Sequence, residues 1–215
     1  MQRIIFLLFL LTLFSCKKQE NLVIKENKDT VEYESTNWQE GFGLTHSIDL
    51  DSVWGKPVRY YISNKNLDSK ALKFYLGNYR PKDEPETARL LNLITTDNDS
   101  LRPFYRWILD KTILIQDGAL GEYTGVPARK YAEKFPKEFF EYMDFDQSGE
   151  KYLSWYNSIA YSGFYDFEYY KDKDGIKGNL VKTMNSNCRN CDETIKKRIL
   201  KFADDCFSHE KTTSK

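Results

Sequence analysis

An amphipathic stripe between residues 101 and 116 is the feature that most constrains the fold of this chain. Apolar side chains recur there with the 3.6-residue period of an α-helix. They are Leu101, Phe104, Tyr105, Ile108, Leu109 and Ile115. Trp107, Ile113 and Leu114 add apolar surface on a second face. The pattern therefore predicts a central helix that packs against neighbours on two sides.

Further helices are predicted on both sides of this stripe. Asp68 or Ser69 is the expected N-cap of the first, and Asp117 is the expected N-cap of a later helix that Pro127 should kink. Residues 57–61 are compatible with a strand or with a first helical turn. The predicted helices cover residues 68–77, 84–95, 118–135, 136–143, 148–161 and 192–207.

Strand patterns are scarce in the sequence, and the connections between the predicted helices are short. Helices joined in this way are expected to pack pairwise and antiparallel. The sequence therefore predicts an all-α fold, either an antiparallel helical bundle or a short stack of helical hairpins. An irregular N-terminal segment should open this helical domain, which is expected to cover residues 37–215.

Residues 1–15 have the pattern of a signal peptide. Arg3 gives a positive start, and residues 4–14 form an apolar run that is too short for a helix across a bilayer. The sequence Leu13-Phe14-Ser15-Cys16 resembles the lipobox of bacterial lipoproteins. That resemblance implies cleavage before Cys16 and attachment of acyl chains, such as palmitate, to its thiol and its new amine. An ordinary secretory signal or an uncleaved anchor is the alternative.

Residues 16–36 are interpreted as a lipidated, flexible tether. The segment is polar, carries Lys and Glu in alternation and has little apolar periodicity, which is typical of a linker. Several acyl chains would hold the protein firmly at a membrane of the cell envelope. Lys17 stands where an Asp often retains bacterial lipoproteins at the inner membrane, so this sorting rule favours the outer membrane. The sequence leaves open whether the domain faces the periplasm or the outside.

Charge argues against one large class of partner. The chain has 32 basic and 32 acidic residues, so no net field draws it to nucleic acid or to an anionic lipid surface. The membrane contact is therefore expected through the lipid. The sequence also lacks G-x-S-x-G, H-E-x-x-H and phosphate-loop motifs, and His46 and His209 are its only histidines. These observations predict a non-enzymatic protein without a cofactor.

Three cysteines besides Cys16 lie near the C-terminus. Cys188 and Cys191 form a C-x-x-C pair, which a disulfide could join or which could stay unpaired. Together with Cys206 and His209 they have a spacing that can suit zinc. A helix from residue 192 would hold Cys191 and Cys206 ~20 Å apart at about 1.5 Å per residue, too far for one ion. Cys206 is therefore expected on an apolar helix face, with a disulfide to it as the alternative.

One loop resembles the opening of a calcium site. Asp144, Asp146 and Ser148 supply oxygen atoms at alternate positions before a glycine, as in an EF-hand loop. The twelfth position, where that family needs a bidentate Glu, holds Trp155. The three residues are therefore weak calcium candidates, and the chemistry of a turn explains them equally well. No metal is predicted.

The aromatic segment 152–170 is the predicted binding surface. Aromatic side chains on a surface can recognise a protein or a glycan. Packing of the same aromatics beneath a long loop is the alternative. The candidate contact residues are Trp155, Phe164, Tyr165 and Tyr169.

Two longer segments, LRPFYRWILDKTILIQDGALGEYTG and RKYAEKFPKEFFEYM, resemble helical domains of uncharacterised bacterial cell-envelope lipoproteins. The resemblance covers about half of the mature chain and implies a fold and an address, without an activity. The anchor, the tether and the lack of catalytic motifs predict a protein-binding module, such as an adaptor, an assembly factor or an immunity-like protein. A glycan- or ligand-binding lipoprotein is the alternative, and a thiol or metal enzyme that uses Cys188 and Cys191 is the third hypothesis.

Overall fold

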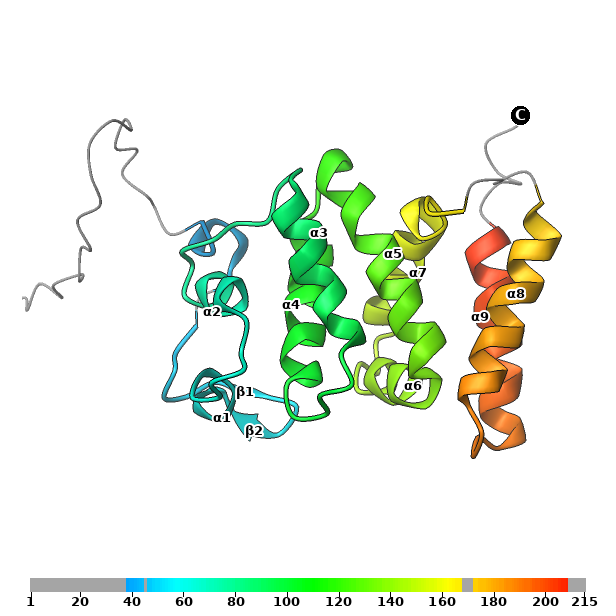
Figure 1. The fold of residues 1–215 in the computed structure, drawn as a ribbon, viewed down its shortest axis with the longest axis horizontal. Helices are drawn as coiled ribbons and strands as arrows, with labels where there is room; N and C mark the ends of the chain where they lie inside the picture. The colour runs from blue at the N-terminus through cyan, green and yellow to red at the C-terminus, as the bar shows by residue number, and fades with distance from the viewer. Residues whose placement is uncertain (1–37, 45, 168–171, 209–215) are drawn as a thin grey trace, which may run out of the picture. The chain divides into compact units, whose positions relative to one another are not determined.

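The structure is a computed structural model that describes residues 38–44, 46–167 and 172–208. These residues belong to one compact unit and form nine α-helices, two 3-10 helices and one short antiparallel hairpin (Figure 1). The predicted all-α fold is confirmed. None of the helices described is long and apolar enough to cross a membrane. Cys16, Tyr169 and His209 lie outside the described residues.

The elements agree with most of the predicted helices, and the hairpin and the first helix share the segment around residue 57. In chain order they are η1 (Glu40–Phe42), β1 (Ser52–Val53), β2 (Lys56–Pro57), α1 (Val58–Ile62), α2 (Ser69–Tyr75), α3 (Pro85–Asn92), η2 (Leu93–Thr95), α4 (Arg102–Ile115), α5 (Gly118–Lys134), α6 (Pro136–Asp144), α7 (Glu150–Ser162), α8 (Lys173–Asn187) and α9 (Glu193–Ser208).

Local capping chemistry fixes where several helices begin. The Asp68 carboxylate accepts hydrogen bonds from the backbone N–H groups of Lys70 and Ala71 at the start of α2. Asp117 accepts from the N–H of Leu120 at the start of α5. These side chains satisfy N–H groups that the first turn of a helix leaves without partners. Both caps lie where the sequence predicts them.

Helix α8 is absent from the sequence prediction. Gly175 and Gly178 lower its intrinsic helix propensity, and its buried side chains are only Ile176, Leu180 and Met184. They lie four residues apart along one face, too sparse a stripe to read without knowing the partner helix. Helix α8 packs along α9 (Figure 1), so tertiary contact stabilises a helix that its own sequence favours weakly.

Helix α4 forms the centre of the core, as the stripe predicts. It packs against α2, α3, α5 and α7 and against the hairpin strand β1. Phe104, Ile108 and Leu109 are buried almost completely. The same helix also buries Arg106 and Asp110, and buried charges of this kind are expected only where they have partners.

Small residues let α5 and α7 cross at close range. A Cβ atom on Gly125 would lie 2.5 Å from the carbonyl oxygen of Ser158 and would also clash with Ser162. The gap is closed by hydrogen bonds: Ser162 Oγ donates to Gly121 O at 2.7 Å, and the hydroxyl groups of Thr124 and Ser158 are 2.6 Å apart. Because a side chain here would push the two backbones apart, the crossing requires glycine.

Two buried tyrosines predict the alkaline limit of the fold. Burial raises the pKa of Tyr61 and of Tyr79 to about 12, whereas an unfolded tyrosine titrates at about 10. The folded state then holds protons that the unfolded state has lost, so stability is complete below pH ~10 and falls as the pH rises further. Unfolding free energies measured across this range check the prediction. Tyr61→Phe should make the fall shallower, and a flat profile for the unsubstituted chain would contradict it.

Candidate functional site

Two of the four predicted surface aromatics belong to the core. Trp155 is fully buried on α7, and its indole N–H donates to the Asp110 carboxylate at 2.9 Å. Phe164 is 1% exposed, and its ring lies 4.7 Å from that of Phe207 between centroids. The prediction that these two residues form a binding surface is therefore wrong, because α7 turns Trp155 toward α4 and the following turn packs Phe164 against α9.

The exposed part of the predicted segment is smaller. Tyr165 is 54% exposed and lies beside Tyr161, which is 51% exposed; their ring centroids are 6.2 Å apart. We call these residues the Tyr161–Tyr165 pair. Tyr169 falls outside the described residues.

The calcium-like loop is a hydrogen-bonded turn. Asp146 accepts from the backbone N–H groups of Ser148 at 3.0 Å and Lys151 at 2.8 Å, and from the Ser148 hydroxyl at 2.6 Å. Asp144 points elsewhere and forms an ion pair with Arg198. Within the described ranges no group of three or more His, Cys, Asp or Glu residues could hold a metal ion. The structure thus uses Asp144, Asp146 and Ser148 for an ion pair and a turn, and it does not bring them together as ligands.

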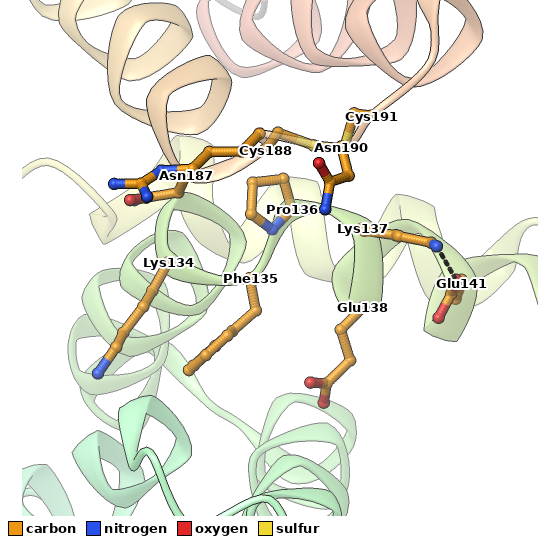
Figure 2. Close-up of a pocket in the computed structure, with 11 residues that line it drawn as sticks. Lys134, Phe135, Pro136, Lys137, Glu138, Glu141, Asn187, Cys188, Asn190 and Cys191 are labelled. Carbon is orange, nitrogen blue, oxygen red and sulfur yellow. Dashed lines mark ion pairs between the residues drawn. A yellow bond between two sulfur atoms is a disulfide. The ribbon is translucent and has the colours of Figure 1, made fainter.

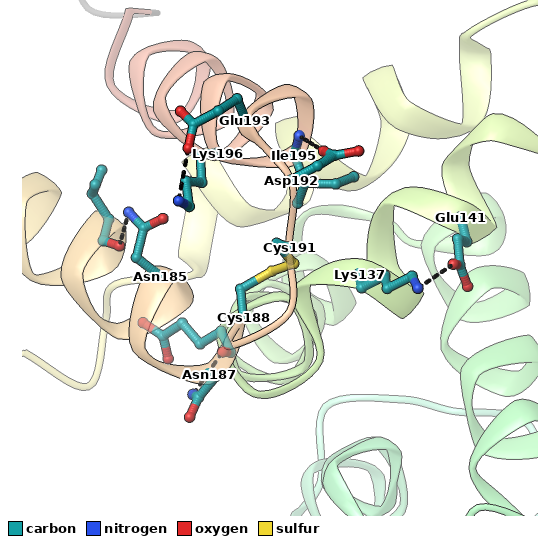
Figure 3. The surroundings of a disulfide bond; sticks show 12 residues. Lys137, Glu141, Asn185, Asn187, Cys188, Cys191, Asp192, Glu193, Ile195 and Lys196 are labelled. Atoms are coloured by element: carbon teal, nitrogen blue, oxygen red, sulfur yellow. Dashed lines mark hydrogen bonds and ion pairs between the residues drawn. A yellow bond between two sulfur atoms is a disulfide. The ribbon is translucent and has the colours of Figure 1, made fainter.

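Cys188 and Cys191 are joined by a disulfide in the loop between α8 and α9 (Figure 3). Cys188 is the C-terminal cap of α8, where the helix dipole disfavours a thiolate. Asp192 follows Cys191 and accepts from the Ile195 N–H at 2.9 Å, which caps α9. Cys206 lies apart on the buried face of α9, and burial raises the pKa of its thiol. Of the two cysteines, only Cys188 lies at the helix end that disfavours a thiolate, since Cys191 precedes the N-terminus of α9.

A groove of 490 Å³ opens beside the disulfide. Figure 2 shows Phe135 and Glu138, from the corner between α5 and α6, across from Asn187 at the end of α8 and from Cys188, which follows it. A groove of this size is large enough for a small ligand. Phe135 is already covered on one side by the guanidinium group of Arg102, 3.9 Å from its ring centroid.

Glu138, the acidic residue in the wall of the groove, is paired with donors inside the protein. Glu138 accepts hydrogen bonds from Arg102 Nε at 2.9 Å, from Arg106 Nη1 at 3.0 Å and from the Tyr131 hydroxyl at 2.9 Å. The basic side is engaged as well, since Lys134 donates to the carbonyl of Thr95 at 2.9 Å. These contacts show that Glu138 and Lys134 take part in hydrogen bonds that hold the fold together at this wall.

A different aromatic pair lies on the surface near the hairpin. Trp54 and Gly55 form the two-residue turn between β1 and β2, with φ angles of 52° and 73°. Two positive φ values in a two-residue loop mark the type I′ turn, which favours Asn-Gly. A Trp in this left-handed conformation is strained by about 1–3 kcal/mol. The Trp54 ring lies 4.6 Å from that of Phe145, and the two are 37% and 73% exposed. We call them the Trp54–Phe145 pair.

The buried guanidinium of Arg106 contacts the Trp54 ring of this pair. The Arg106 guanidinium lies 4.2 Å from the ring centroid of Trp54 and 4.1 Å from that of Tyr142. Arg106 is only 1% exposed and is fixed in turn by Glu138 and Tyr131. Stacking of a guanidinium between aromatic rings is favourable. No period or motif in the sequence predicts the pair, and the Trp-Gly dipeptide between Val53 and Lys56 is its visible signal.

Comparison with protein families, curated proteins and solved structures gives no match to this chain. The class of the protein is therefore defined by its own geometry, an all-α domain with a disulfide-bounded groove and a strained, exposed aromatic pair.

Proposed function

We propose that this chain is a lipid-anchored protein of the cell envelope whose helical domain binds a protein partner through the Trp54–Phe145 pair. The strained backbone of Trp54 is the observation that carries the proposal. A residue with φ of 52° and a large side chain persists only where surrounding contacts hold it, and such strain clusters at functional sites. At this position the strained backbone presents the exposed indole of Trp54.

The type and the setting of these side chains support a contact with a protein. Trp is enriched among the residues that dominate binding energy at interfaces. The Arg106 guanidinium over the indole and the tilted Tyr142 ring beside it fix the position of the indole before binding, so little side-chain entropy is lost on association. Next to Phe145, Asp144 and Arg198 form an exposed ion pair, and a polar rim around an apolar centre is typical of interfaces.

The N-terminal sequence supports the proposed location at a membrane of the cell envelope. The lipobox-like residues ending at Cys16 and the polar segment after them would hold the domain at a membrane and let it reach a partner nearby. An adaptor, an assembly factor or an immunity-like protein fits this arrangement. The outer membrane is the proposed location, because Lys17 follows the cysteine.

A capture experiment with matched variants tests the proposal. The full-length chain is purified gently from envelope membranes, and bound proteins are identified by mass spectrometry. The test variant combines Trp54→Asn with Phe145→Ser, since Asn suits the turn and relieves its strain. The control combines Tyr161→Ser with Tyr165→Ser, which removes equally exposed aromatic surface elsewhere.

We expect one stoichiometric partner with the unsubstituted chain and with the control. The Trp54→Asn, Phe145→Ser variant should lose it, with affinity reduced by a hundredfold or more, as expected for two hot-spot residues at about 2 kcal/mol or more each. Retention of the partner by this variant, shown to be folded by circular dichroism, would contradict the proposal.

Glycan binding is the second candidate function, and the Tyr161–Tyr165 pair is the observation that favours it. Two exposed tyrosine rings 6.2 Å apart can form a platform for a sugar ring. The same two variants then give the opposite pattern on a glycan array. Loss of binding in the Tyr161→Ser, Tyr165→Ser variant alone would favour this function over the first.

We expect the disulfide to stabilise the loop without taking part in partner binding. Replacing Cys188 and Cys191 with serine should lower the free energy of unfolding by about 2 kcal/mol, since the closed loop is short. Partner capture by the folded variant should not change. Chemical denaturation and the capture experiment measure the two effects. Loss of capture at unchanged fold would instead favour a role for the thiols in function.

A further inference from the structure

A second, separate cavity lies where the irregular N-terminal segment meets the core. It has a volume of 250 Å³, and its lining includes residues from three segments that are far apart in the sequence. His46 and Asp51 come from the N-terminal segment, Tyr75 from α2, and Trp107 and Lys111 from α4. The tertiary fold therefore gathers an imidazole, a carboxylate and an ammonium group around one space.

Asp51 orients the imidazole ring of His46. Its Oδ2 atom lies 3.6 Å from His46 Nδ1, and it accepts hydrogen bonds from the Ser47 N–H at 2.7 Å and the Tyr75 hydroxyl at 2.9 Å. A carboxylate beside Nδ1 favours the tautomer with its proton on that nitrogen. Nε2 then carries a lone pair and acts as a hydrogen-bond acceptor.

That acceptor is buried without a partner. Among the residues described, none forms a hydrogen bond with His46 Nε2, and a buried polar atom in this state costs about 1–3 kcal/mol. Burial lowers the pKa of His46, Asp51 opposes this shift, and the charge of Lys111 adds to it. The ring packs against Tyr75 and Trp107, whose ring centroids each lie 5.0 Å from its own. The ring is therefore a fixed aromatic wall of the cavity beside the Asp51 carboxylate.

The charges around the cavity define the rest of the ligand. None of the contacts of Asp51 described above uses its Oδ1 atom, so one carboxylate oxygen remains for a cation. Lys111 lines the same cavity with the opposite charge. A volume of 250 Å³ corresponds to about eight water molecules at ~30 Å³ each. The site is therefore complementary to a small zwitterion.

We propose that this cavity binds a free α-amino acid. The ammonium group of the ligand donates to Asp51 Oδ1, and its carboxylate pairs with Lys111. The Tyr75 and Trp107 rings add favourable contact with the ammonium group. This site is independent of the Trp54–Phe145 pair, and its occupancy does not require the protein partner.

Isothermal titration of the full-length protein with a panel of small probes tests this inference. The panel holds glycine, L-alanine and L-leucine, together with L-alanine amide, which lacks the carboxylate, and propionate, which lacks the ammonium group. Lys111→Met removes one charge without touching the contacts of Asp51, and Asp51→Asn removes the other. Lys182→Met, an exposed lysine on α8, is the matched control.

We expect at least one amino acid of the panel to bind with a dissociation constant below about 1 mM. Its amide and propionate should each bind at least tenfold more weakly, and Lys111→Met should weaken the amino acid by at least tenfold while Lys182→Met has no effect. The inference is overturned if no amino acid binds at about 10 mM, if propionate binds as tightly as the amino acid, or if Lys111→Met leaves the affinity unchanged.

Discussion

Replacing Gly125 with valine is expected to prevent the domain from folding. Even the Cβ atom of the new side chain would lie 2.5 Å from the Ser158 carbonyl oxygen, so α5 and α7 would have to separate. The hydrogen bond from the Gly125 N–H to Ser162 Oγ, 3.1 Å long, would break with them. We expect a loss of more than about 4–5 kcal/mol, comparable to the whole stability of a small domain. Circular dichroism and chemical denaturation measure the effect.

Gly178 provides the matched control. It lies in α8, and apart from the neighbouring backbone of its own helix no heavy atom lies within 4 Å of the position that a Cβ would take. Gly178→Ala should therefore stabilise the domain by about 0.4–1 kcal/mol, because it restricts the unfolded chain and strains nothing. A Gly125→Val protein that folds with nearly the same stability would show that the close crossing of α5 and α7 is wrong.

Glu138→Ala should destabilise the domain by about 3–5 kcal/mol, because it removes one partner from a buried ion pair. Arg106 is 1% exposed and pairs with Glu138 at 3.0 Å. Arg102 and the Tyr131 hydroxyl also donate to this carboxylate, so the substitution leaves several buried donors unmatched. Since Arg106 holds the Trp54 indole, partner affinity should fall as well.

Glu141 on the same helix is the control for this substitution. It is 53% exposed and lies 3.9 Å from Lys137 as its ion-pair partner. Glu141→Ala should change the free energy of unfolding by no more than about 0.5 kcal/mol. Combining Glu138→Ala with Arg106→Met should recover part of the lost stability, because the unpaired charge of Arg106 is then removed while Arg102 keeps its ion pair with Asp99. Equal effects of Glu138→Ala and Glu141→Ala, measured by denaturation, would contradict the buried network.

The fold was predictable where local signals are strong. The stripe of α4 and the caps Asp68 and Asp117 depend on residues close in the sequence, so period and capping rules predict them. Helix α8 was missed because its stability comes from packing against α9. Trp155 was misplaced because the segment around it carries aromatic residues on every face, and composition cannot tell which face turns inward.

The candidate sites were much less predictable, because long-range contacts create them. The proposed role of Trp54 depends on Arg106 and Phe145, which lie far along the chain and contact its ring. The cavity beside His46 likewise requires Lys111 of a distant helix. Contacts between residues far apart in the chain do not follow the period of a helix or a strand. A single sequence therefore holds no regular spacing from which these contacts could be predicted.

Photo-crosslinking in living cells tests the central claim most directly. A photoreactive phenylalanine analogue is placed at position 145 of the full-length chain, and at position 165 as the control, since both side chains are well exposed. The proposal predicts one crosslinked envelope protein from position 145, lost on Trp54→Asn, and none of that protein from position 165. Absence of any crosslink from position 145, or the same product from both positions, would contradict it.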